Sequence, residues 1–250
     1  MKRNVLYGLV IFGATAHAQV VIQNTSSNSG VVNLGGGNVG SVTIDGKTMS
    51  GNGAGVMGSG QTATRQRTVE PFSRVTVEIA GNVRITMGPE PRINVQADSN
   101  VVDLISMKVS NSTLTIAASE PFTAKVPIQI EIAAPTIAAV TLAGAGSIDL
   151  SGISGRNLEL TLGGSGDIKA KGSIDDLVAR IGGSGNLSLG ELAARKGRVA
   201  IDGVGDAEVF VKEELIAEIS GTGEIVYRGS PRVSTKISGV GDVAAAADRE

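Results

Sequence analysis

A motif repeated along the second half of the sequence carries its most regular set of candidate ligand side chains. It reads apolar-x-Gly-x-Gly-polar-apolar, and its polar position holds, in order, Ser147, Asp167, Asn186, Asp206, Glu224 and Asp242. Carboxylate and amide oxygens bind hard cations such as Ca²⁺. The same residue types stabilise tight turns by hydrogen bonding to nearby backbone. The motif predicts turn chemistry, with a column of cation or ligand contacts at Asp167, Asn186, Asp206, Glu224 and Asp242 as the alternative.

The residue types present exclude several kinds of catalytic site. The sequence has no cysteine, and its one histidine is His17. A Ser-His-Asp triad, a Cys-His pair and a thiolate metal site therefore cannot form once His17 is removed with the segment described next. Glycoside hydrolysis needs two positioned carboxylates, but the adjacent acids of Asp175-Asp176 and Glu213-Glu214 would face opposite sides of a strand. We expect no enzyme and no cofactor.

Residues 1–18 have the three parts of a secretory signal peptide. Lys2 and Arg3 precede an apolar stretch at residues 5–14, and Ala16-His17-Ala18 supplies the small-x-small cleavage pattern. The apolar stretch is shorter than the roughly 20 residues that a membrane-spanning helix needs. We therefore expect an exported protein that is periplasmic, on the cell surface or extracellular, with no membrane span after signal cleavage.

Composition divides the remaining chain into two parts. Residues 19–66 are rich in Gly, Asn, Ser and Thr, which predicts a flexible leader, within which residues 41–45 alternate and could pair as a strand. Residues 67–250 form the predicted β domain, in which residues 101–109 could instead form a short helix. With 22 Lys and Arg, 24 Asp and Glu, and 2% aromatic residues, the chain offers no nucleic-acid-binding surface.

The spacing of the motif determines the predicted fold class. Its second glycine falls at residues 146, 166, 185, 205, 223 and 241, in steps of 20, 19, 20, 18 and 18. Apolar residues alternate with polar ones around each motif, as at Leu158, Leu160 and Leu162, which indicates strands with one buried face. Six short units in a row predict an all-β, parallel β-helix or solenoid of about 18–20 residues per coil, with a more irregular β-rich part before it. A right-handed coil is favoured because parallel crossovers are right-handed, while the steps of 18 leave the left-handed alternative open.

The glycine pair of each motif is predicted to form the corner of a coil. Glycine adopts positive φ at no steric cost, and the chain must bend sharply once in every coil. The predicted corner glycines are Gly144, Gly146, Gly164, Gly166, Gly183, Gly185, Gly203, Gly205, Gly221, Gly223, Gly239 and Gly241.

The sequence resembles a known family over residues 67–245. The stretch Arg67-Thr-Val-Glu-Pro-Phe-Ser-Arg-Val-Thr-Val77, followed by paired strands and Gly-Ser-Gly-Asp-Ile repeats, is similar to the head GIN domain of putative auto-transporter adhesins. The resemblance implies an exported right-handed β-helix with an adhesin role. We expect that the chain is not itself an auto-transporter, because no part of it resembles a translocator barrel or a trimeric stalk.

These features together predict a non-enzymatic protein of the cell envelope or surface. Regular outward columns of Thr, Ser, Asp, Lys and Arg would contact a surface glycan or an envelope protein at several points. A self-assembling envelope scaffold, and so a homo-oligomer, is the alternative, because the last coil near residues 243–247 has few charges to cap it. A polysaccharide-acting β-helix enzyme is a less favoured alternative.

Overall fold

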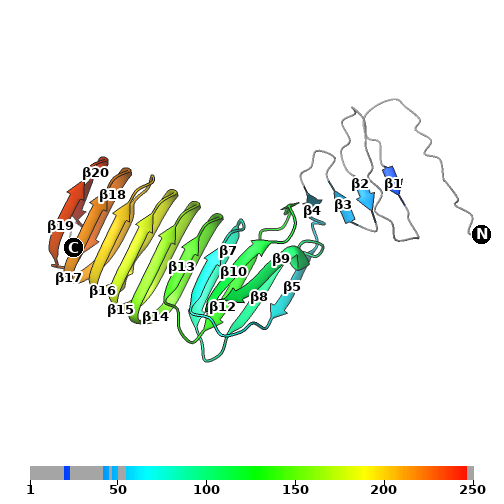
Figure 1. Ribbon diagram of the computed structural model, residues 1–250, viewed down its shortest axis with the longest axis horizontal. Coiled ribbons are helices and arrows are strands. Elements are labelled where there is room, and N and C mark those ends of the chain that lie inside the picture. Colours follow the sequence, from blue (N-terminus) through cyan, green and yellow to red (C-terminus); the bar gives the residue numbers. More distant parts are fainter. Residues whose placement is uncertain (1–19, 23–41, 45–46, 50–54, 247–250) are drawn as a thin grey trace, which may run out of the picture.

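A computed structural model gives the structure of the chain for residues 20–22, 42–44, 47–49 and 55–246 (Figure 1). The predicted signal peptide, residues 1–18, lies outside these described residues, as does most of the predicted leader. Within the leader, the predicted strand at residues 41–45 is present as β2, Val42–Ile44.

The described residues form two β-sheets. The smaller sheet has the strand order β1-β2-β3-β4-β11 and contains β1 (Val20–Ile22), β2, β3 (Lys47–Met49), β4 (Val56–Met57) and β11 (Phe122–Thr123). The first part of the larger sheet contains β5 (Thr62–Arg67), β6 (Arg74–Val77), β7 (Gly81–Met87), β8 (Arg92–Asp98), β9 (Ile105–Ser110), β10 (Thr113–Ala118) and β12 (Gln129–Ala134). Its second part contains β13 (Ala139–Leu142), β14 (Ala145–Leu162), β15 (Ser165–Ile181), β16 (Ser184–Ile201), β17 (Ala207–Ile219), β18 (Thr222–Arg228), β19 (Arg232–Ile237) and β20 (Val240–Ala245).

The second part is a stack of parallel coils, which confirms the predicted β-solenoid. The motif positions stack in register, so that Ile148 pairs with Ile168 and Ile168 pairs with Leu187. Strands β13 to β20 follow one another along the rod in Figure 1. Each coil has two long sides that meet at the Gly-x-Gly corner and one short side, as in the paired runs 145–150, 153–155 and 157–162 of β14.

The interior of the coils is filled by the alternating apolar residues. Leu158, Leu160 and Leu162 are at most 1% exposed, and the equivalent residues of the next coil, Leu177 and Ile181, are buried on top of them. Because side chains alternate along a strand, the residues between them point outward. The register that buries the apolar set therefore also fixes which polar residues form the surface.

The N-terminal end of the solenoid is closed by antiparallel strands. Strand β9 pairs antiparallel with β10, and β8 pairs antiparallel with both β12 and β5. The sequence allowed a short helix at residues 101–109. The structure has only a three-residue 3-10 helix there, Val102–Leu104, and residues 105–109 belong to β9. Val101, Val102, Leu104 and Ile105 are buried there, so this end of the core is covered.

The two glycines of each corner are required for different reasons. In the first five corners the second glycine has a positive φ, for example +137° at Gly166, where L-residues are strained. The first glycine is needed for close stacking, because a Cβ on Gly164 would overlap the carbonyl oxygen of Gly144 in the preceding coil. The sequence predicted that both glycines would be needed for positive φ. The structure shows this for the second glycine of the pair, whereas the first is needed for close stacking.

Residues 55–66 differ from the expected flexible leader. Strand β5 pairs with β8 along its whole length, from Thr62 opposite Asp98 to Arg67 opposite Ile93. The buried carboxylate of Asp98 accepts hydrogen bonds from the backbone N–H of Gly60 at 2.6 Å, Lys125 at 2.9 Å and Val126 at 3.0 Å. This polar segment has no regular alternation of apolar residues. It is ordered instead by the pairing of β5 with β8 and by the hydrogen bond of Gly60 to the buried carboxylate of Asp98.

Candidate polar binding face

A row of ten polar side chains crosses neighbouring coils on one long side of the molecule, nine of them in strands and Asp206 directly before β17. The register pairs Thr64 with Gln96, Gln96 with Gln129, and Gln129 with Asn82. It continues from Asn82 to Ser147 and into the motif positions of the solenoid. We call this set the polar row: Thr64, Gln96, Gln129, Asn82, Ser147, Asp167, Asn186, Asp206, Glu224 and Asp242.

The motif half of the polar row is occupied by hydrogen bonds between coils. Oδ1 of Asp167 accepts from the backbone N–H of Asn186 at 3.1 Å and from Nδ2 of Asn186 at 3.0 Å. The backbone N–H of Asp206 donates to Oδ1 of Asn186 at 3.2 Å, and that of Glu224 donates to Oδ1 of Asp206 at 2.8 Å. Asp167, Asn186 and Asp206 thereby each fasten the corner of the following coil, so these bonds join successive coils, whereas the sequence predicted hydrogen bonds within each turn.

The cation alternative finds no cluster to support it. Among the described residues, no group of three or more His, Cys, Asp or Glu side chains is arranged to hold a metal ion. Oxygens of Asp167 and Asp206 face backbone N–H donors of the next coil instead.

The other half of the polar row is neutral and belongs to strands outside the repeat. Gln129 and Asn82 are exposed and Gln96 is half-buried. Oγ of Ser147 lies 2.9 Å from Oδ1 of Asn82 and donates to it. The motif did not reveal these residues, because their strands are antiparallel or lie far apart in sequence. Their outward positions in alternating strands were the available signal.

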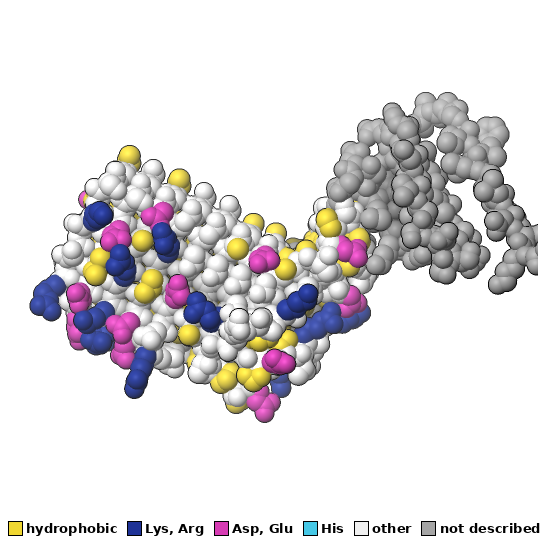
Figure 2. All heavy atoms as spheres, viewed as in Figure 1, with side chains coloured by type: hydrophobic (Ala, Val, Ile, Leu, Met, Phe, Trp, Pro, Cys, Tyr) yellow, Lys and Arg dark blue, Asp and Glu magenta, His cyan; other side chains and the backbone are white. Residues whose placement is uncertain are grey.

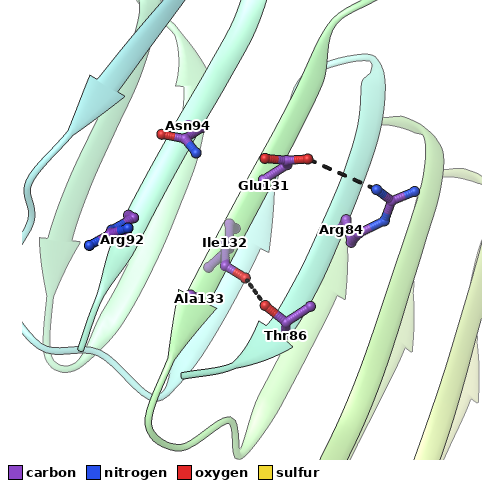
Figure 3. A pocket seen from close by; sticks show the side chains of 7 residues that line it. All are labelled: Arg84, Thr86, Arg92, Asn94, Glu131, Ile132 and Ala133. Carbon is purple, nitrogen blue, oxygen red and sulfur yellow. Dashed lines mark hydrogen bonds and ion pairs between the residues drawn. The ribbon is translucent and has the colours of Figure 1, made fainter. Parts of the chain in front are cut away.

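Two shallow hollows flank an ion pair beside this neutral half. In Figure 3, Arg84 of β7 and Glu131 of β12 point toward each other, with Nη1 of Arg84 and Oε1 of Glu131 3.9 Å apart. The first hollow also has Arg92 and Asn94 of β8 on its wall, and Oγ1 of Thr86 donates to the carbonyl of Ile132 at 3.4 Å. The second hollow lies across β12, β7 and β14 and is lined by Asn82, Val83, Arg84, Gln129, Ile130, Glu131, Ser147 and Asp149.

The charged side chains of the later coils are paired with one another. Figure 2 shows both signs of charge side by side over this part of the rod. Stacking in register brings residues about one coil apart into contact. The resulting ion pairs include Lys171 with Glu191 at 2.8 Å, Arg195 with Glu213 at 3.1 Å, Lys196 with Glu214 at 2.8 Å and Arg198 with Glu218 at 3.0 Å. The basic residues thus contribute to a mixed, solvated face.

Contacts between coils lower the pKa values of three carboxyl groups. A hydrogen bond from Ser220, followed by one from Arg180, holds the pKa of Asp202 below its usual value. The hydrogen bond from Lys171 lowers the pKa of Glu191, and that from Lys196 lowers the pKa of Glu214. These acids stay ionised near neutral pH and serve as structural partners of the neighbouring coil.

The adjacent acids considered for glycoside hydrolysis are divided among such pairs. Arg195 lies 4.0 Å from Asp175, 3.9 Å from Asp176 and 3.1 Å from Glu213. Glu214 is paired with Lys196 on the next strand position. The four carboxylates are therefore ion-pair partners of Arg195 and Lys196 on the surface.

No helix within residues 20–22, 42–44, 47–49 and 55–246 is long and apolar enough to cross a membrane.

Comparison with solved structures shows the same fold elsewhere. A crystal structure of a putative adhesin from Bacteroides fragilis NCTC 9343 aligns with a TM-score of 0.63 and 23% identity, over 76% of this chain and 99% of that chain. Two further chains align with lower TM-scores. A putative lipid binding protein from Parabacteroides distasonis ATCC 8503 gives 0.46 at 20% identity, over 76% of this chain and 99% of its own. A putative adhesin from Parabacteroides merdae ATCC 43184 gives 0.45 at 16% identity, over 77% of this chain and 99% of its own.

Sequence comparison identifies the family. No curated protein matches the chain significantly. A family model described as "Putative auto-transporter adhesin, head GIN domain" matches residues 71–231, from just before β6 to just after β18. With its parallel coils, its Gly-x-Gly corners and this match, the chain belongs to the head GIN domain family of that description.

Proposed function

We propose that this protein is an exported, non-enzymatic adhesion protein that binds a surface glycan on the neutral half of its polar row. The observation that supports this most strongly is the second hollow, where Gln129, Asn82 and Ser147 stand side by side on three adjacent strands. The family description and the similar fold of a putative adhesin from Bacteroides fragilis support the same class of function.

The side-chain chemistry of the hollow suits a sugar. Carboxamides both donate and accept hydrogen bonds, and hydroxyls do the same, so Gln129, Asn82 and Ser147 can match sugar hydroxyls of either orientation. Glu131, Arg84 and Asp149 form the adjacent row and add charged donors and acceptors. Strands about 4.8 Å apart repeat these groups at a fixed spacing.

The shallow shape of the hollow predicts weak binding at a single sugar. Each exposed hydrogen bond contributes only about 1 kcal/mol after exchange with water. Useful attachment would then depend on several contacts along an extended glycan, whose affinities multiply when they are linked. The row continues on both sides of the hollow, which provides the length for such contacts.

The test is a glycan array probed with the full chain and two matched variants. The double variant Gln129→Ala, Asn82→Ala removes the carboxamides of the hollow. The control double variant Thr141→Ala, Thr161→Ala alters a neighbouring polar pair on the other long side, where Thr141 and Thr161 are register partners. We expect binding to fall at least tenfold in the first variant and to persist in the control. Equal binding by all three proteins would refute this location.

The enzymatic alternative has a separate assay. Incubation of the protein with a panel of polysaccharides is expected to release no new reducing or unsaturated ends. Turnover of any member of the panel would overturn the non-enzymatic part of the proposal.

A further inference from the structure

The last coil of the solenoid leaves its apolar side chains uncovered. Val233 is 36% exposed and Ile237 is 44% exposed, whereas the equivalent Leu215 and Ile219 of the preceding coil are at most 1% exposed. Strand β19 pairs with β17 and β20 pairs with β18, and among the described strands neither has a partner on its other edge. An open edge of this kind is a template for pairing with another chain.

The shape of the open end indicates what could cover it. It is a complete solenoid cross-section, with two six-residue strands, β19 and β20, joined by the corner at Ser238 and Gly239. A second solenoid end has the same cross-section and so can cover both strands at once. The N-terminal end is already covered by Val101, Val102, Leu104 and Ile105. The outer edges of β5 and β9 at that end are also unpaired among the described strands, but no large apolar side chain is exposed there to match those of the last coil. Two C-terminal ends, which both carry such side chains, therefore match each other and meet as a closed two-fold pair.

The coil geometry selects the direction of the two-fold axis. The two long sides meet at the glycine corner, so an axis that bisects this corner exchanges them. Strand β19 runs toward the corner and β20 runs away from it, and the exchange therefore sets β19 of one copy antiparallel to β20 of the other. An axis across β19 alone would pair that strand with itself, leave β20 unmatched and bring Arg232 near Lys236 of the second copy.

Side-chain alternation and charge together select the register. Apolar faces stay inside only if inward residues oppose inward residues, because a slip by one residue reverses every side chain. Shifts by two residues keep this alternation, and among them the register with Gly239 on the axis brings opposite charges together. In this register Thr235 opposes Val243 of the second copy and Val233 opposes its Ala245. The same register places the outward Lys236 opposite the outward Asp242 of the second copy. Both side chains are exposed, and neither forms an ion pair within the described part of the chain.

We infer that two copies of this chain associate end to end through β19 and β20, as a closed dimer with Lys236 of each copy facing Asp242 of the other. The inference is independent of the glycan proposal. It makes the protein a rod with two polar rows, one in each half, so that one dimer could bridge two surfaces.

Analytical ultracentrifugation of the full chain tests the dimer, with charge-reversal variants to locate it. The wild type should sediment at twice the mass of one chain. Lys236→Glu and Asp242→Lys should each weaken the dimer at least tenfold, since each creates two like-charge contacts. An equimolar mixture of the two variants should restore dimers, because unlike charges then meet at both positions. Lys108→Glu, a reversal on the exposed face of β9 at the closed end, is the matched control and should leave the dimer unchanged.

Any other result of the ultracentrifugation experiment contradicts the inferred dimer. A wild type that stays monomeric at every concentration refutes association, and growth beyond a dimer refutes closure. A dimer that survives both reversals uses another surface. Failure of the mixture to recover, with both variants shown by circular dichroism to be folded, refutes the pairing of Lys236 with Asp242.

Discussion

Three glycines of one corner allow a direct test of why the coils stack so closely. Gly182, Gly183 and Gly185 lie within four residues of each other between β15 and β16, and alanine at each has a different expected effect. A Cβ on Gly182 would lie 3.9 Å from the nearest atom, the carbonyl oxygen of Leu162. A Cβ on Gly183 would overlap the carbonyl oxygen of Gly164, and one on Gly185 would overlap that of Gly166.

The structure gives the size of each effect. Gly182→Ala has room and lies outside the left-handed region, so it should raise stability by about 0.5 kcal/mol through the unfolded state. Gly183→Ala must open the coils where the backbone N–H of Ser184 donates to Gly164 at 2.9 Å and that of Gly183 donates to Leu162 at 3.0 Å. Losing two such bonds costs about 2 kcal/mol. Gly185→Ala adds the strain of a φ of +137°, another 1–2 kcal/mol or so.

Denaturant unfolding followed by circular dichroism measures all three variants against the wild type. We expect the order of stability Gly182→Ala, Gly183→Ala, Gly185→Ala, with a loss of about 3–4 kcal/mol in the last. In a chain of this size that loss lowers the melting temperature by about 10 °C. The reasoning is refuted if Gly182→Ala is as destabilising as Gly185→Ala, or if Gly185→Ala is neutral.

Three further variants probe the closed end, the core and the surface. Burial acts to raise the pKa of Asp98, but hydrogen bonds from Val126, Gly60 and Lys125 outweigh it, so the folded pKa lies below 3.8. Asp98→Ala should cost about 3–5 kcal/mol at pH 7 in chemical unfolding. The wild type should lose part of this advantage as the pH falls from 3.8 through the folded pKa, and a variant with unchanged acid sensitivity would contradict the assignment. Leu160→Ala, at a fully buried position, should cost about 2–5 kcal/mol by the same measurement, and a loss under about 1 kcal/mol would show a loosely packed interior. Arg198→Ala breaks an exposed pair with Glu218 and should shift the melting temperature by no more than about 2 °C; a larger shift would mean that the surface pairs act together.

The solenoid was predictable because its signal is repeated. The motif returns every 18–20 residues, and alternation around it, as at Leu158 and Leu160, fixes which face is buried. Parallel in-register stacking follows from these two facts. The bends of the short side, such as the irregular register between Leu150 and Ile153, carry no repeated residue type and were not predictable.

The N-terminal part was less predictable for a physical reason. Strand β5 has the sequence Thr-Ala-Thr-Arg-Gln-Arg, with little apolar alternation, and its position depends on pairing with β8 and on the long-range contacts of Asp98. The same limitation hid half of the polar row. Asp167 and Asn186 were visible through the motif, whereas Gln129 and Asn82 join the row only through the pairing of β12 with β7.

Distances along the polar row test the central claim of ten in-register positions most directly. The sequence has no cysteine, so pairs of introduced cysteines can carry spin labels without interference. Electron–electron dipolar spectroscopy would be applied to Ser147→Cys/Asp206→Cys, Ser147→Cys/Asp242→Cys and Thr64→Cys/Asp242→Cys, diluted with unlabelled protein. At about 4.8 Å per strand, three, five and nine steps predict separations of about 14, 24 and 43 Å. Separations that fail to increase in this order, or a longest pair that lies no farther apart than the second, would contradict the continuous row.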